Sequence, residues 1–133
     1  YKRQVMDAAV AILMIGMGLA IAGIWTRDIL VGDRVDLSEG LFRARDAKSG
    51  TLFWPHWLAE YSTAALLTVS GIGLLADVSW ATLLAGIALG ALFYTSTNSL
   101  GWAFAERERF SYAGPMIAGI IVSLVGAGHL LLR

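Results

Sequence analysis

Residues 8–25 read AAVAILMIGMGLAIAGIW, a stretch without a charged side chain. Such a run is close to the roughly 20 apolar residues that a helix needs to cross a hydrocarbon core about 30 Å thick. Three further stretches, at 57–76, 80–103 and 113–132, have the same apolar character. The sequence therefore predicts an all-α integral membrane protein with four transmembrane helices.

Composition limits the rest of the chain. Of 133 residues, 57% are hydrophobic, so little polar sequence remains outside the four spans and residues 1–133 form a single transmembrane domain. Lys+Arg and Asp+Glu number 10 each, so no net charge attracts nucleic acid, and we expect the lipid bilayer as the main surroundings. The absence of cysteine excludes disulfides, thiolate metal sites, iron–sulfur clusters and thiol catalysis.

The connections between the spans are uneven in length. Residues 77–79 join the second and third spans, so these two helices must form a tight antiparallel hairpin. Residues 106–112 join the third and fourth spans, and only the first connection, 27–55, is long. These links predict an up-down-up-down bundle with both termini and the 77–79 turn on one face. The two charged loops lie on the other face.

The long first loop contains a pattern that is typical of a short amphipathic helix at the membrane interface. Asp36 precedes Glu39 at the spacing of a capping box, and apolar and charged residues separate onto two sides over 35–48. Phe53, Trp54 and Trp57 follow at the start of the second span. Aromatic residues are common where helices enter the interface. We therefore interpret this region as an interfacial anchor, with a lid over a binding site as the alternative.

The basic residues predict the orientation of the chain, because Lys and Arg are enriched in cytoplasmic loops. The basic residues of the loop face are Arg27, Arg34, Arg43, Arg45, Lys48, Arg107 and Arg109, and those of the terminal face are Lys2, Arg3 and Arg133. We expect a multi-pass protein with its charged loops in the cytoplasm. Any basic residues that precede Tyr1 would add positive charge to the terminal face.

Polar residues at membrane depth are the strongest candidates for function, because a charge in hydrocarbon is costly unless it is paired or hydrated. Glu60 and Asn98 lie in the two hairpin spans, and at about 1.5 Å per residue both are on the order of 25–29 Å from the 77–79 turn. We expect them to face each other. Neighbouring candidates for the same site are His56, Tyr61, Thr95, Ser99 and Arg107. Both a structural clasp and a ligand or ion site fit this pattern.

A second polar level lies at the opposite face of the bundle. Asp7 begins the first span and His129 is near the end of the fourth, so the topology brings them to the same level. A carboxylate beside a histidine stabilises its protonated form. We therefore predict a structural Asp7–His129 pair, with a proton-sensitive contact as the alternative if the pair is buried.

Glycines indicate where helices approach one another. Gly86 and Gly90, at i and i+4 in the third span, form a small-residue face of the kind that packs against another helix in lipid. We expect the partner to be a helix of the same chain, with a second chain as the alternative.

Several chemistries are disfavoured by the same residues. His56 and His129 fall on opposite sides of the bilayer, so bis-histidine haem ligation is not expected, and we expect no cofactor and no metal ion. Asp33, Asp36 and Glu39 lack the ligand pattern of a calcium loop. The chain has no GxSxG or HExxH motif and no phosphate-binding glycine loop.

Three functional hypotheses remain. The first is a small non-enzymatic bundle that assembles with itself or with a larger membrane complex. The second is a transporter or channel subunit that binds a cation or small solute at the Glu60/Asn98 site. The third is an interfacial enzyme that acts on a lipid-like substrate, with Glu60 or His56 as the base.

Overall fold

The computed structural model describes residues 2–31, 35–47 and 49–132, and within these ranges it contains four α-helices. Their bounds are α1 Lys2–Val31, α2 Trp54–Leu75, α3 Ala81–Ala105 and α4 Ala113–Leu131. A 3₁₀ segment, η2 (Arg107–Tyr112), leads into α4. Four segments are long and apolar enough to cross a membrane: α1, α2, α3 and the η2–α4 segment. The prediction of an all-helical fold class is confirmed by these helices. Tyr1, Asp33, Arg34, Lys48 and Arg133, which the sequence analysis names, lie outside the described residues.

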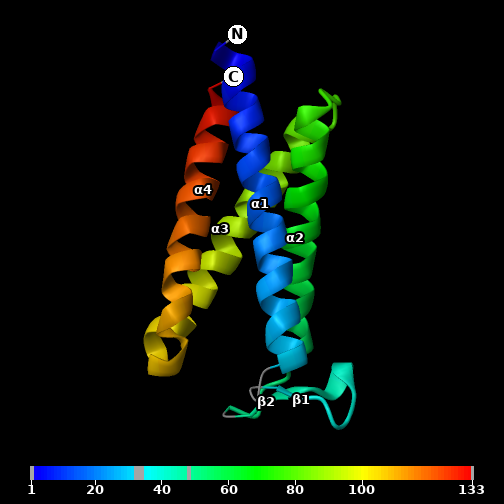
Figure 1. Cartoon of the computed structure of the whole chain (residues 1–133), viewed down its shortest axis with the longest axis vertical. Coiled ribbons are helices and arrows are strands. Elements are labelled where there is room, and N and C mark those ends of the chain that lie inside the picture. Colours follow the sequence, from blue (N-terminus) through cyan, green and yellow to red (C-terminus); the bar gives the residue numbers. More distant parts are fainter. Residues whose placement is uncertain (1, 32–34, 48, 133) are drawn as a thin grey trace.

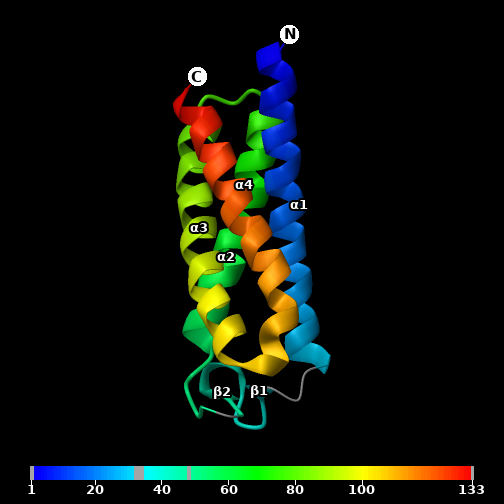
Figure 2. The ribbon, with the colours of Figure 1, turned by 90° about the vertical axis from the view of Figure 1, so that its left-hand side faces the viewer.

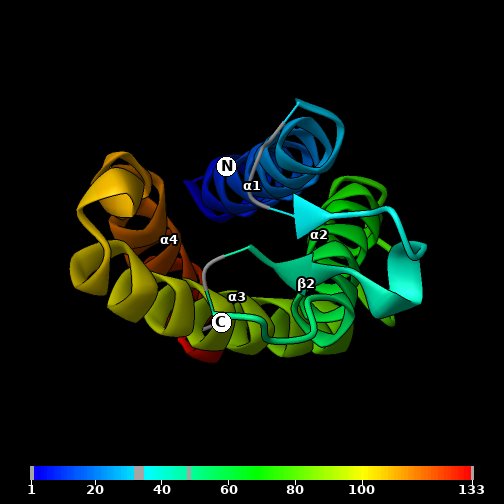
Figure 3. The same ribbon diagram turned by 90° about the horizontal axis from the view of Figure 1, so that it is seen from below.

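Successive helices run in opposite directions, as the short connections predict. Both ends of the chain and the turn between α2 and α3 lie at one end of the bundle (Figures 1 and 2). The first loop and η2 lie at the other end. Helices α1 and α4 meet beside the termini and diverge toward the loop end, where they stand on opposite sides of the molecule (Figures 1 and 3).

The turn between α2 and α3 is a Schellman motif. The Val78 amide donates to the Gly73 carbonyl at 3.0 Å, and the Asp77 amide donates to the Leu74 carbonyl at 3.3 Å. Asp77 occupies the left-handed position of this motif with φ 53°. Glycine usually takes that position, but aspartate tolerates it better than most residues. The motif ends α2 abruptly and lets α3 return beside it.

Glycine allows α1 and α2 to pack at close range. A Cβ atom on Gly18 would lie 2.7 Å from the Ala64 carbonyl oxygen, and one on Gly71 would lie 2.8 Å from the Ala11 carbonyl oxygen. Both positions therefore exclude any side chain. The centre of the bundle is filled by fully buried apolar side chains, the largest of which are Met14, Leu67, Leu89 and Leu92.

Gly86 and Gly90 do not take part in this packing. A Cβ atom at either position would meet no atom within 4 Å among the described residues. Helix α3 instead approaches α4 at Gly119, where an added Cβ would collide with the Ser96 side chain. The prediction that Gly86 and Gly90 contact a helix of the same chain is wrong, because both lie on the outer side of α3. A contact with a second chain stays a prediction.

The first loop forms a small hairpin rather than the predicted amphipathic helix. Strands β1 (Val35–Asp36) and β2 (Arg45–Asp46) pair antiparallel, with Val35 opposite Asp46. One 3₁₀ turn, η1 (Leu41–Arg43), lies between them. The prediction of a helix over 35–48 is therefore wrong for the described part of that range, which excludes Lys48.

Local chemistry explains the hairpin. The Asp36 carboxylate accepts a hydrogen bond from the Ser38 amide at 2.9 Å, which closes an Asx turn instead of capping a helix. Gly40 then adopts φ 92°, a conformation that interrupts a helix. The hairpin is held to the bundle because buried Ala44 packs with Phe53 and Trp57 at the start of α2.

Candidate functional site

A cavity of about 110 Å³ lies inside the loop end of the bundle and is lined by residues of all four helices. Its walls are mostly apolar and aromatic. The aromatic residues that line it include Trp25, Phe53, Trp57 and Trp102. The polar residues that line it are Asp28, Glu60, Ser96, Ser99, Arg109 and Tyr112. The volume is of the order of an engineered protein cavity, about 150 Å³, that takes up benzene. The cavity can therefore hold several water molecules or a small organic group.

Glu60 is the buried acid of this cavity, with 3% of its surface exposed. The Ser99 hydroxyl donates a hydrogen bond to its Oε1 at 3.2 Å, and His56 Nε2 lies 3.7 Å from the same oxygen. The Trp25 side chain is a further hydrogen-bonding neighbour of the carboxylate. The structure therefore places three predicted neighbours beside one another: Glu60, Ser99 and His56.

Asn98 does not belong to this group. It is exposed on the outer side of α3, whereas Thr95, Ser96 and Ala103 of the same helix are buried. At 3.6 residues per turn, Asn98 lies roughly 180° around the helix from buried Leu89, nine residues earlier, so its side chain points away from the bundle. The predicted contact between Glu60 and Asn98 is wrong, and Ser99 provides the partner.

Three other candidates lie nearby without touching the Glu60 carboxylate. The Thr95 hydroxyl donates to the Leu92 carbonyl of its own helix at 3.4 Å. The Tyr61 hydroxyl pairs with the Thr26 hydroxyl at 2.7 Å, which ties α2 to α1. Arg107 is exposed at the loop end, so it does not form an ion pair with the Glu60 carboxylate.

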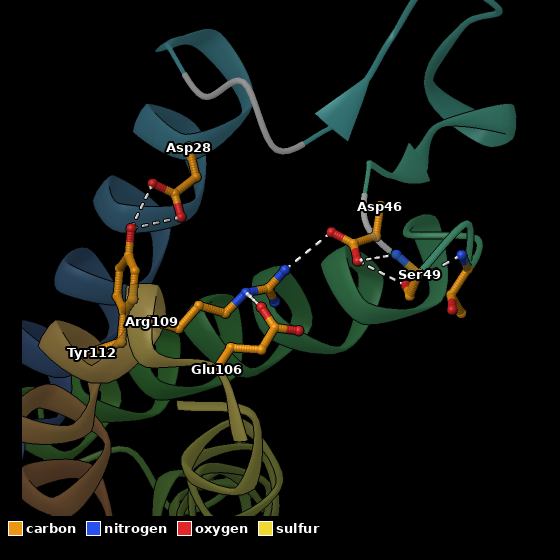
Figure 4. A network of polar contacts seen from close by, with 7 residues as sticks. Asp28, Asp46, Ser49, Glu106, Arg109 and Tyr112 are labelled. Carbon is orange, nitrogen blue, oxygen red and sulfur yellow. Dashed lines mark hydrogen bonds and ion pairs between the residues drawn. The ribbon is translucent and has the colours of Figure 1, made fainter. Parts of the chain in front are cut away.

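Arg109 is a site residue that the sequence analysis did not select. Its guanidinium is 3.0 Å from Asp46 of β2 and 2.6 Å from Glu106, and it lies 5.3 Å from the centre of the Trp102 ring (Figure 4). Only 9% of Arg109 is exposed. The i, i+3 spacing of Glu106 and Arg109 was visible in the sequence, but Asp46 is distant in the chain. This cluster joins the hairpin to the loop end of the cavity.

Asp46 is well suited to hold that cluster in its ionised form. Burial raises the pKa of Asp46, but hydrogen bonds from the Ser49 hydroxyl and amide, together with the charge of Arg109, outweigh burial and leave the pKa below its ordinary value. The hydroxyl bond is 2.7 Å long and the amide bond 3.0 Å. Asp46 is therefore a carboxylate at neutral pH, and its ion pair with Arg109 keeps the hairpin beside the cavity.

Among the described residues, one polar contact joins α1 to the η2–α4 segment at the terminal end of the bundle, and another joins them at the loop end. The His129 ring nitrogen Nε2 lies 2.7 Å from Asp7 Oδ1 near the termini, so the predicted pair forms, while its response to protons stays a prediction. At the loop end, the Tyr112 hydroxyl lies 3.0 Å from both carboxylate oxygens of Asp28 (Figure 4). The cavity lies between these contacts, toward the loop end.

The cavity reaches the outer surface between α1 and α4. Ala20 of α1 and Ala118 of α4 both line it, and both are exposed. Their small side chains leave the side of the bundle open at this level. We define the mouth of the cavity by these two alanines.

The cavity also contains unused hydrogen-bonding capacity. Trp57 is 4% exposed, and its indole N–H has no hydrogen-bond partner among the described residues. His56, which does not line the cavity, also has no hydrogen-bond partner for its Nε2 among the described residues, because Glu60 is too far away. Buried polar groups are normally satisfied, so an unpartnered donor beside a cavity indicates an acceptor that the chain itself does not supply.

Comparison with known proteins gives one family. Residues 5–132 match the model of a family described as "Domain of unknown function (DUF8058)". No curated protein and no solved structure matches the chain. The family description assigns no activity, ligand or partner, so it adds no functional residue to those described above.

Proposed function

We propose that this chain, which belongs to the DUF8058 family of domains of unknown function, is an integral membrane protein. We propose further that it binds a small, mostly apolar molecule in the cavity around Glu60. One observation supports this most strongly. A buried carboxylate and an unpartnered indole N–H line the same aromatic cavity, which opens at the side of the bundle. Binding sites for small molecules are typically apolar cavities with a few polar groups of this kind.

Insertion in a bilayer explains the rest of the surface. Large hydrophobic side chains such as Leu19, Leu83 and Ile121 are more than half exposed on the outside of the helices. In water these surfaces would favour aggregation, whereas in lipid they contact acyl chains. The mouth at Ala20 and Ala118 would then face the bilayer, so we infer that ligands enter from the lipid. In the transporter hypothesis, this entry of a ligand from the lipid is the step in which the solute binds.

The proposed orientation places the hairpin and η2 in the cytoplasm, because most Lys and Arg residues lie on that side. The native chain has no cysteine, so Lys2→Cys and Glu108→Cys each carry a single thiol. We expect a membrane-impermeant maleimide to label these two variants from opposite sides of sealed vesicles. Labelling of both from the same side would contradict the three membrane crossings that separate residues 2 and 108.

The binding proposal is tested by closing the mouth. Benzyl alcohol, a neutral aromatic probe, should change the tryptophan emission of the purified protein in a saturable way, because three tryptophans line the cavity. Ala20→Phe fills the mouth and should abolish the saturable change. Leu19→Phe is the matched control, because Leu19 is 62% exposed on the same helix and does not line the cavity. Emission that changes only in proportion to probe concentration, in all three proteins, would overturn the proposal.

A second function, assembly, is favoured by a different surface. Gly86, Gly90 and Asn98 are all exposed along the outer side of α3. Small residues and an exposed amide at membrane depth are the features by which transmembrane helices associate. We propose this face as a contact with a second chain or a membrane-complex partner.

A further inference from the structure

The acidic and basic side chains of the cavity lining differ in whether an opposite charge neutralises them. Within the described part of the chain, neither Asp28 nor Glu60 has a lysine or arginine within ion-pair distance. Asp28 is partnered by the Tyr112 hydroxyl, and Glu60 by the Ser99 hydroxyl and the Trp25 side chain. Hydroxyl groups stabilise a carboxylate but do not neutralise its charge.

Among the described lining residues, Arg109 is the only lysine or arginine, and it is already paired. It forms ion pairs with Asp46 and Glu106, neither of which lines the cavity. Its positive charge is therefore largely used at the loop end of the site. What remains for a ligand is the two carboxyl groups of Asp28 and Glu60, and a bound cation would stabilise their ionised forms.

The walls suit a positive charge as well. Trp25 and Trp57 line the cavity together with Phe53, and the faces of such rings attract cations, whereas the Trp102 ring already contacts Arg109 and stacks on His56. The unpartnered Trp57 indole N–H is an independent sign that the lining is incomplete without an occupant. Its acceptor is a bound water molecule, because a cation accepts no hydrogen bond.

We propose that the ligand of this cavity is a small organic monocation, an ammonium ion attached to one ring or a compact apolar group. This rests on the proposed binding function and names its ligand class. The ammonium group lies between Asp28 and Glu60, and the apolar part lies against the tryptophans and extends toward the mouth. A volume of about 110 Å³ restricts the enclosed part to roughly one small ring.

The inference is tested with three probes of nearly equal shape and different charge. Benzylammonium, benzyl alcohol and benzoate are titrated into the full chain in a non-ionic detergent at pH 7 and constant ionic strength, with tryptophan emission as the readout. We expect benzylammonium to bind about tenfold more tightly than benzyl alcohol, or better, because a charged hydrogen bond replaces a neutral one. Benzoate should show no saturable binding.

A charge-neutral variant then locates the effect. Asp28→Asn keeps an oxygen that accepts from Tyr112, so the fold should be unchanged, while the preference for benzylammonium over benzyl alcohol, taken as the ratio of the two affinities, falls. Equal or tighter binding of benzyl alcohol by the native chain, or saturable binding of benzoate, would overturn the cation inference and leave the binding proposal standing. If none of the three probes binds saturably, the binding proposal and the cation inference both fail.

Discussion

Glu60→Leu is expected to abolish benzylammonium binding and to lower the free energy of unfolding by about 1–3 kcal/mol, because the Ser99 hydroxyl would lose its acceptor in a buried position. Leucine fills a similar volume, so the loss would not arise from a void. Both effects can be measured on one preparation, by tryptophan emission and by denaturation in detergent.

Glu60→Gln separates the charge of Glu60 from its hydrogen bond. The glutamine amide oxygen still accepts from Ser99, so stability should change by less than about 1 kcal/mol. Benzylammonium affinity should fall by about tenfold or more, whereas benzyl alcohol affinity should stay the same. Glu39→Gln, in the exposed first loop, removes the same charge away from the cavity and should change neither. Unchanged benzylammonium binding by Glu60→Gln would mean that Glu60 is only a structural clasp.

Gly71→Leu is expected to be strongly destabilising, with a loss of about 3 kcal/mol or failure to fold. An added Cβ would lie 2.7 Å from the Ile15 side chain and 2.8 Å from the Ala11 carbonyl oxygen. The side chain can move, but the backbone oxygen cannot move without displacing α1. Thermal unfolding in detergent should therefore show a strongly lowered midpoint.

Gly86→Leu and Gly90→Leu are matched controls for the glycine prediction. They make the same substitution in a helix, but the new side chain meets no atom of the described chain within 4 Å of its Cβ. Their unfolding midpoints as monomers should stay close to that of the native protein. If Gly90→Leu changes the oligomeric state, the assembly proposal gains support. A Gly90→Leu variant as unstable as Gly71→Leu would contradict the helix packing described here.

The helices and their order could be predicted from sequence because they depend on the length of apolar runs and of the connections. The rotation of each helix about its axis could not be predicted. Helix α3 is apolar on nearly all sides, so nothing in its pattern distinguishes the side of Ser99 from that of Asn98. The choice depends on α4, which approaches α3 at Gly119 and turns Ser96 inward.

The loop end of the site was less accessible to sequence analysis. The spacing of Asp36 and Glu39 fits a helix cap, but the Asp36 carboxylate closes an Asx turn instead, and Gly40 then interrupts any helix. The partners Asp46 and Arg109 are 63 positions apart. Their pairing follows from the folded hairpin and from no local pattern. The Asp7–His129 pair was predictable because topology alone places both residues at the same level.

The most direct measurement of ligand binding in the cavity is an NMR spectrum of the indole N–H signals during titration with benzyl alcohol or benzylammonium. The chain has five tryptophans, and each gives one such signal. Trp25, Trp57 and Trp102 line the cavity, whereas Trp54 and Trp80 are 36% and 48% exposed outside it. We expect the first three signals to shift saturably, with the unpartnered Trp57 N–H among them, and the last two to stay in place. Shifts of equal size in all five, or in Trp54 and Trp80 alone, would show that the probes only dissolve in the surrounding detergent and that the cavity is not a binding site.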